Sequence, residues 1–245
     1  MSYRTLDAAE IVKTLRTLER RIAQRFPDAG LAAVARDLIA IGEDTQRKAE
    51  AIAAPNWPLR VVVYVAVAAG LAGLGMIAWE INVQLGNAEV FTFFQGVDAA
   101  MNITVLVGAA LLFATTLDDR TKRRRALREL HIFRSIAHVI DMHQLTKDPS
   151  SLLAGGPRTE ASPTRSMSQF ELTRYLDYCS EMLSLTSKLA ALYAQVLPDA
   201  VVIDAVNEIE NLTASLSRKI WQKISIVESF TVVDPQLRLS GHDRS

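Results

Sequence analysis

Two long runs without a charged side chain constrain this chain more than any other feature of its sequence. Residues 61–79 read VVVYVAVAAGLAGLGMIAW, and residues 99–117 read AAMNITVLVGAALLFATTL. Each run has about the length of ~20 apolar residues that a helix needs to cross the ~30 Å hydrocarbon core of a bilayer. Buried helices of soluble proteins usually carry shorter apolar runs, of ~10–14 residues. We therefore predict two membrane-spanning helices, at about 58–80 and 98–117, joined by an outer loop at 81–97.

The residues that flank the two runs indicate how the spans are oriented. Trp57 and Trp79 bracket the first run, as aromatic side chains do at a membrane surface. The loop 81–97 has no lysine or arginine, whereas a basic segment follows the second run directly. Short basic flanks stay on the cytoplasmic side. We therefore expect a multi-pass protein of the bacterial inner (plasma) membrane, with both termini in the cytoplasm.

The basic segment is also a candidate lipid-binding site. We call it the juxtamembrane cluster, and its members are Arg120, Lys122, Arg123, Arg124, Arg125 and Arg128. Basic residues next to a membrane attract anionic headgroups of the inner leaflet by ~1 kcal/mol each. Asp118 and Asp119 reduce that attraction locally. The cluster is explained equally well if its only role is to set the membrane topology. Both interpretations stay open.

Small residues recur at a spacing of four within the first run. Ala66 precedes Gly70, and Ala69 precedes Gly73, by four residues. Such pairs let the backbones of two membrane helices approach closely. We predict helix packing at these four positions and at Gly108 of the second run. Packing within one chain and packing between two copies both fit the pattern.

The rest of the chain reads as amphipathic helices. Apolar residues recur in steps of three and four, which is the period of a helix with one buried face. The segments are an N-terminal helical hairpin at 1–56, an extension of the second span at 118–146, a flexible linker at 147–168, an antiparallel helix pair at 169–229 and a polar tail at 230–245. We predict an all-α membrane protein, in which a two-helix transmembrane hairpin carries a cytoplasmic helical bundle built from the N- and C-terminal segments.

A polar stripe runs along the predicted extension at 118–146. At ~100° per residue, His131, Arg134, His138 and Asp141 fall on one side of this helix, and His143 falls on its apolar side. A solvated surface is the simplest interpretation of the stripe. A hydrogen-bonded seam against another helix or a partner is the second, and a metal or proton site is the third.

Composition and motifs exclude several classes of function. The formal net charge is +0, so no overall basic field favours nucleic acid. The single cysteine, Cys179, excludes an intrachain disulfide. The chain carries none of the phosphate-binding, dinucleotide-binding, zinc or nucleophile-elbow motifs. We therefore expect no catalytic residues, no cofactor and no metal.

Three hypotheses for the function remain. The favoured one is a non-enzymatic inner-membrane scaffold or interaction protein that binds anionic lipid and either self-associates, as a homo-oligomer, or holds an unidentified protein partner. The second is a subunit of a small channel or transporter, with Asn102, Thr104 and Glu80 as pore candidates. The third is a membrane-bound enzyme that uses His131, His138 and Asp141.

Overall fold

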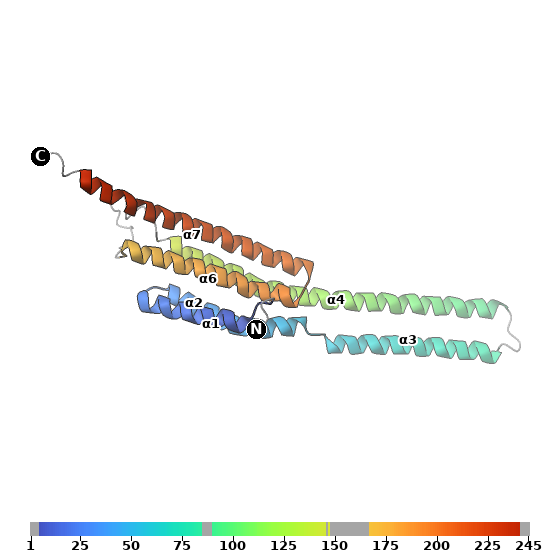
Figure 1. Cartoon of the computed structure of the whole chain (residues 1–245). Helices are drawn as coiled ribbons and strands as arrows, with labels where there is room; N and C mark the ends of the chain where they lie inside the picture. The colour runs from blue at the N-terminus through green and yellow to red at the C-terminus, as the bar shows by residue number, and fades with distance from the viewer. Residues whose placement is uncertain (1–4, 85–89, 146, 148–166, 241–245) are drawn as a thin grey trace, which may run out of the picture. The chain divides into compact units, whose positions relative to one another are not determined.

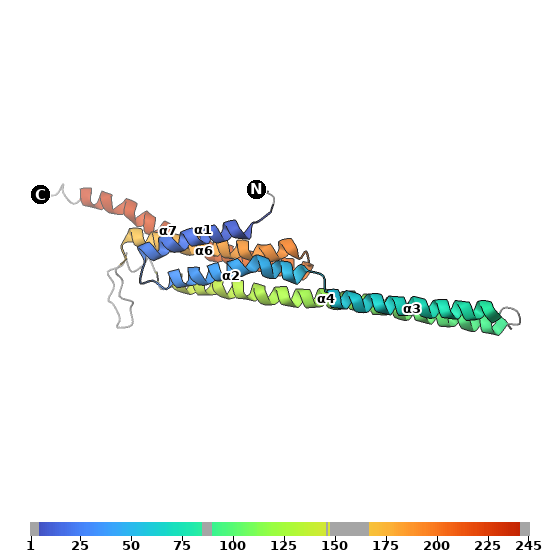
Figure 2. The ribbon, with the colours of Figure 1, turned by 90° about the horizontal axis from the view of Figure 1, so that it is seen from below.

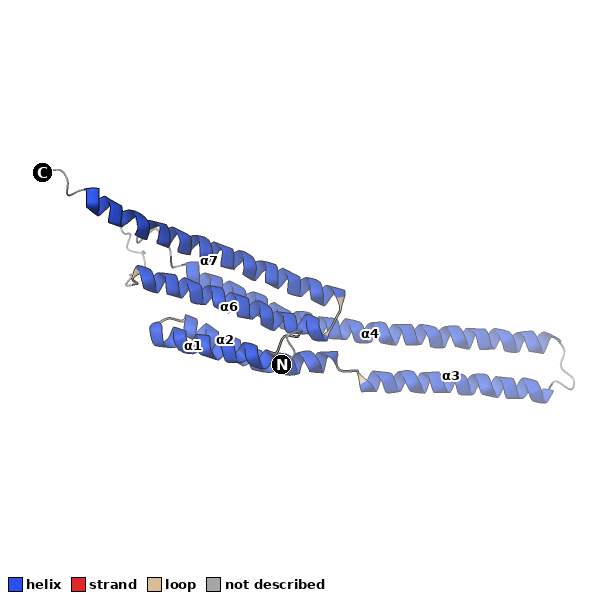
Figure 3. Cartoon of the chain, viewed as in Figure 1, coloured by secondary structure: helices blue, strands red, loops and turns tan. Residues whose placement is uncertain are grey.

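The protein is all-α in the part that the structure describes. A computed structural model describes residues 5–84, 90–145, 147 and 167–240. Six helices lie in these ranges (Figures 1 and 3). They fall into two compact units, which we call the hairpin unit (Ala53–Arg125) and the bundle unit (Met1–Ile52 with Ala126–Ser245). Helix α4 (Val90–Leu145) contributes its first part to the hairpin unit and its last part to the bundle unit.

Helices α1 (Ala8–Arg25) and α2 (Leu31–Ala53) form the predicted N-terminal hairpin of the bundle unit. Asp7 caps α1, because its side chain accepts a hydrogen bond of 2.8 Å from the backbone N–H of Ala9. Arg16 of α1 and Glu43 of α2 form an ion pair of 2.6 Å across the hairpin. The apolar stripe of α1 is buried, as its period predicted; it comprises Ile11, Leu15, Leu18 and Ile22.

Helix α6 (Gln169–Val196) is the centre of the bundle unit. It lies between α1 and α7 (Figures 1 and 2). Ser168 and Glu171 fix its start as a capping box. Both of its predicted apolar stripes are buried along most of their length, from Leu172 to Leu192. A helix with two buried stripes needs neighbours on two sides, which is the bundle arrangement expected from the sequence.

Aromatic contacts connect α6 to the helices around it. The ring of Phe26, at the end of α1, meets the ring of Tyr175 edge to face at 5.3 Å between centroids. Phe133 of α4 meets Tyr193 of α6 in the same way at 6.2 Å. Edge-to-face pairs of this kind contribute ~0.5–1.5 kcal/mol beyond the burial of their area. The two contacts tie α1 and α4 to opposite ends of α6.

Helix α7 (Ala200–Ser240) returns antiparallel to α6 after a short turn. Asp199 caps α7, because its carboxylate accepts a hydrogen bond of 3.0 Å from the backbone N–H of Val201. The helix continues to Ser240 instead of ending near residue 229, so it includes Pro235. The segment 230–245 was predicted as a tail because it is polar, and α7 occupies its first part.

The last part of α4 packs into the bundle unit along the predicted face. Ala126, Leu130, Phe133, Ala137 and Ile140 are all at most 2% exposed. The predicted continuity of the second apolar run with the segment 118–146 is confirmed, because α4 is one helix to Leu145. It begins at Val90, within the segment 81–97 that was predicted as the outer loop.

The hairpin unit contains α3 (Trp57–Gln84) and the first part of α4. The two helices lie side by side (Figures 1 and 2), and a Cβ placed at Gly70 would lie 2.7 Å from Val107 Cγ2. By length and composition, one described helix, Gly96–Leu145, is apolar enough to cross a membrane. The described apolar segment of α3, Val61–Gly73, is shorter. The sequence predicted two membrane-spanning helices, and one helix passes this test among the described residues.

Candidate functional site

The base of the hairpin unit is closed by a polar clip. Asn56, just before α3, donates a hydrogen bond from Nδ2 to Oδ1 of Asp118 on α4. Lys122, one turn further along α4, forms an ion pair of 3.0 Å with Oδ2 of the same carboxylate. The Lys122 and Asp118 side chains are only 14% and 18% exposed. Asp118 thus fixes the point at which the chain enters α3.

The juxtamembrane cluster follows this clip and is not uniform. The Lys122 ammonium group is paired with Asp118, and Arg123 is half-buried. The other four members are exposed: Arg120, Arg124, Arg125 and Arg128. The cluster therefore presents four open guanidinium groups, with their charges on different sides of α4.

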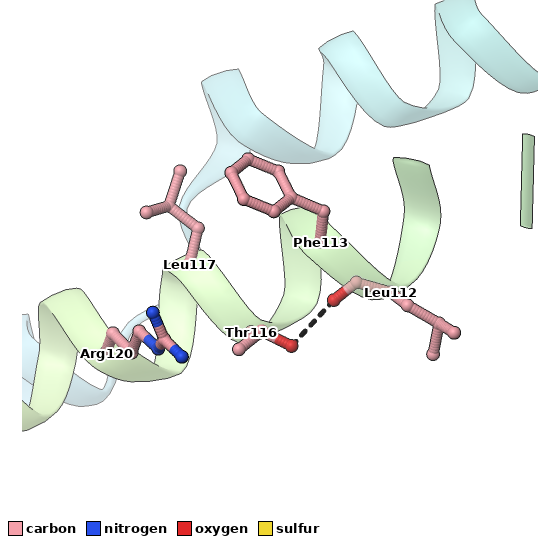
Figure 4. A pocket seen from close by; sticks show the side chains of 5 residues that line it. All are labelled: Leu112, Phe113, Thr116, Leu117 and Arg120. Atoms are coloured by element: carbon pink, nitrogen blue, oxygen red, sulfur yellow. Dashed lines mark hydrogen bonds between the residues drawn. The ribbon is translucent and has the colours of Figure 1, made fainter. Parts of the chain in front are cut away.

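An open hollow adjoins the first of these guanidinium groups (Figure 4). Arg120 lines one end of the hollow, and Thr116 lies in its middle, with its hydroxyl donating to the Leu112 carbonyl at 2.7 Å. The other lining residues are apolar: Leu112, Phe113 and Leu117. An apolar surface that ends in a cation suits a ligand with an apolar chain and an anionic head.

The polar stripe on α4 divides into two parts. Arg134 forms an ion pair with Glu208 of α7, and Asp141 accepts a hydrogen bond of 2.5 Å from Gln144. His131 and His138 are exposed. Two members of the stripe thus belong to polar contacts within the bundle unit, and two face solvent.

Gln144 connects this stripe to α7. It is 2% exposed, and its Oε1 accepts a hydrogen bond of 2.6 Å from Nζ of Lys223. The same ammonium group donates to the backbone carbonyl of Gln144 at 3.1 Å. A lysine that reaches the last carbonyls of a helix satisfies acceptors that the helix cannot. Lys223 therefore caps the end of α4.

His143 lies on the other side of α4, against the turn between α1 and α2. A Cβ placed at Gly30 would lie 2.9 Å from His143 Cε1. Partial burial of the imidazole lowers the pKa of His143, and the positive charge of Lys147 lowers it further. The histidine is packed, in agreement with its predicted place on the apolar side of the helix.

The small residues of the hairpin unit differ in their surroundings. Gly70 lies against Val107, whereas a Cβ at Gly73 or Gly108 would meet nothing within 4 Å. Ala66 and Ala69 are exposed. Among the three glycines, Gly70 is thus the one with a close neighbour in the described part of the unit. Packing of the other four positions against a second chain stays a prediction.

The described residues contain no group of three or more histidine, cysteine or acidic side chains that could hold a metal ion. Cys179 is fully buried in α6, and burial raises the pKa of its thiol to about 12. Such a thiol stays protonated and is a poor nucleophile at neutral pH.

Sequence reasoning missed the clip and the α7 partners of the stripe. The spacing of four between Asp118 and Lys122 was a usable signal, since residues four apart are neighbours on a helix. Nothing in the sequence pattern points to Asn56, Glu208 or Lys223, because their partners are distant along the chain. Comparison with protein-family models, with curated proteins and with solved structures finds no match to this chain.

Proposed function

We propose that this chain is a membrane-anchored helical scaffold. In this proposal α3 and the first part of α4 cross the plasma membrane, and the bundle unit holds a partner in the cytoplasm. The observation that carries the proposal is the exposed apolar surface of the hairpin unit. Met76, Trp79, Leu112 and Phe113 are 72%, 75%, 72% and 70% exposed. Soluble monomers rarely expose apolar patches beyond a few hundred Å², and a bilayer removes the cost of exposing such side chains to water.

The hydroxyl groups on this surface are compatible with lipid. Thr104 donates to the Ala100 carbonyl at 2.9 Å, and Thr115 donates to the Leu112 carbonyl at 3.0 Å. In hydrocarbon every polar group must find a partner within the protein. Bonds to the preceding turn meet that need without water.

The distribution of charge supports the orientation. The juxtamembrane cluster follows the apolar part of α4 directly, and residues 81–97 contain no lysine or arginine. With the cluster on the cytoplasmic side, as basic flanks require, its exposed guanidinium groups meet the anionic inner leaflet. The bundle unit then lies in the cytoplasm.

The bundle surface favours self-association. Large apolar side chains remain exposed on α4 and α7 of the bundle unit, among them Met142 at 67%, Leu145 at 59% and Trp221 at 54%. Aromatic residues and methionine are enriched in protein interfaces. We expect a homo-oligomer, with a dimer as the simplest form, and its mass in nanodiscs tests this expectation. A monomeric mass in nanodiscs and in mild detergent contradicts it.

Thiol labelling tests the anchoring and the orientation together. A cysteine introduced at the loop, Asn87→Cys, should react with a membrane-impermeant maleimide in intact cells. The matched control introduces a cysteine into the exposed cytoplasmic surface, His138→Cys, which should react only after lysis. The native Cys179 is buried and gives little background. Labelling of Asn87→Cys only after lysis, or recovery of the protein in the soluble fraction, refutes the proposal.

A channel or transporter subunit is the alternative. Its support is that the polar side chains of Asn102 and Thr104 are exposed on α4. However, both are already engaged on their own helix, since Asn102 donates to Asp98 at 3.4 Å. Ion flux through liposomes that contain the purified protein would favour the channel over the scaffold.

A further inference from the structure

The hollow beside Arg120 differs from the rest of the exposed apolar surface, because it has a cation at one end. No ion pair engages the Arg120 guanidinium among the residues that the structure describes. Figure 4 shows Arg120 one helical turn beyond Thr116, with Phe113 and Leu117 on the same stretch of α4. The hollow thus has a polar end and an apolar end along one helix.

The polar part of the hollow, at Thr116 and Arg120, faces away from α3. Val107 packs toward Gly70 of α3, and Ala114, seven residues further along α4, is 8% exposed. At ~100° per residue, Thr116 and Arg120 lie roughly 170° and 130° around α4 from that buried face, and Phe113 and Leu117 lie roughly 110° and 70° from it. The other helix of the hairpin unit therefore leaves the hollow open to the surroundings.

The local charge selects an anion for the polar end of the hollow. Residues 118–128 contain six basic and two acidic side chains, a net charge of +4 (6 − 2). Asp118 is already engaged by Asn56 and Lys122. Within residues 118–128, Asp119 is the other acidic side chain that can offset the neighbouring guanidinium groups. A zwitterionic headgroup would bring a second cation into this positive field, whereas an anionic headgroup would not.

We propose that the hollow holds one anionic phospholipid. The Arg120 guanidinium donates to the phosphate, and an acyl chain lies over Leu112, Phe113 and Thr116. The proposal rests on the proposed membrane anchoring and makes it specific, because it separates one bound lipid from the diffuse attraction of the whole cluster. Arg124 and Arg125 then act on the leaflet only at longer range.

Native mass spectrometry of the full-length protein tests this site. The protein is released from detergent after titration with phosphatidylglycerol or with phosphatidylcholine, and retained lipid is counted. We expect one phosphatidylglycerol to be retained in preference to phosphatidylcholine. Arg120→Gln should weaken that retention at least tenfold, because it removes a charge-assisted hydrogen bond. The matched variant Arg124→Gln also removes one positive charge, but outside the hollow. Since Arg124 attracts the lipid only at long range, this variant should weaken retention about fivefold at most.

A second variant tests the apolar end of the hollow. Thr116→Trp fills the middle of the hollow and leaves every charge in place, so it should also reduce retention of phosphatidylglycerol. Equal losses for Arg120→Gln and Arg124→Gln, or equal retention of the two lipids by the unchanged protein, overturn the proposal. Membrane fractionation separates this failure from that of the anchoring, since Arg120→Gln should stay in the membrane fraction.

Discussion

Gly42 of α2 faces side chains of α1 and α6, and its replacement by alanine should destabilise the protein. A Cβ at this position would lie 2.9 Å from Val12 Cγ2 on α1 and 3.2 Å from Leu189 Cδ1 on α6. Both distances are shorter than ordinary carbon contacts of ~3.5–4.0 Å. Neither neighbour can retreat easily, because Val12 is 6% and Leu189 is 0% exposed.

Two effects of opposite sign decide the size of this change. Alanine is favoured over glycine in a helix by ~1 kcal/mol. Overpacking of a filled core costs ~1–3 kcal/mol, and the two close contacts at Gly42 place it near the middle of that range. We expect a net loss of about 1 kcal/mol, which lowers the melting temperature by roughly 2–4 °C for a protein of this size.

Thermal unfolding of the full-length protein, followed by circular dichroism in detergent, measures this loss. The double variant provides the control. Val12→Ala removes the methyl group that a Cβ at position 42 would meet first, so Gly42→Ala should be neutral or stabilising in the Val12→Ala background. If Gly42→Ala instead raises the melting temperature of the unchanged protein, glycine at this position is solvated and α1 does not pack here.

Three further predictions concern the polar residues of α4. The pKa of His143 is lowered in the folded state, so its contribution to stability is complete above the unfolded pKa of ~6.5 and is lost as the pH falls below that value. His143→Gln should therefore flatten the decrease in melting temperature between pH 7.5 and pH 5. An unchanged decrease refutes the assignment. Lys223→Met leaves Oε1 of the buried Gln144 without this donor, which should cost ~1–3 kcal/mol in unfolding experiments, whereas Lys219→Met, on the exposed side of α7, should change little. His138→Ala removes an exposed side chain and should change the free energy of unfolding by no more than ~0.5 kcal/mol; a larger loss would indicate that a partner covers it.

The period of apolar residues was enough to predict which faces of the helices are buried. The stripes on α1, α4 and α6 are buried as the sequence indicated, for example at Leu15, Phe133 and Met182. Helical geometry puts residues three and four apart on one side of a helix. The same rule placed His143 on a packed side and His138 outside it. Local chemistry was readable as well, since Asp199 directly precedes α7 and is of a residue type that caps helices.

What the sequence could not predict depends on neighbours that are distant along the chain. Arg134 and Asp141 share a stripe with His131 and His138, and periodicity alone cannot show that Glu208 engages Arg134. The ends of long helices were also misplaced, as with Val90 at the start of α4. Helix ends are set by a few weak contacts, whereas a buried stripe sums the burial of many side chains.

The change of pattern along α4 explains why its cations gather where they do. From Gly96 to Leu117 the helix is mostly apolar, with Asp98 as its one charged residue, and it is largely exposed. From Ala126 onward it has one buried face, and charged residues occupy the others. A helix that is apolar all round needs an apolar environment, and one with a single apolar stripe needs water on its other side. In the proposed anchoring, the residues between these two patterns would lie where the two environments meet. Asp118, Arg120 and Lys122 occupy that interval of one continuous helix, and it is there that we propose the bound lipid phosphate.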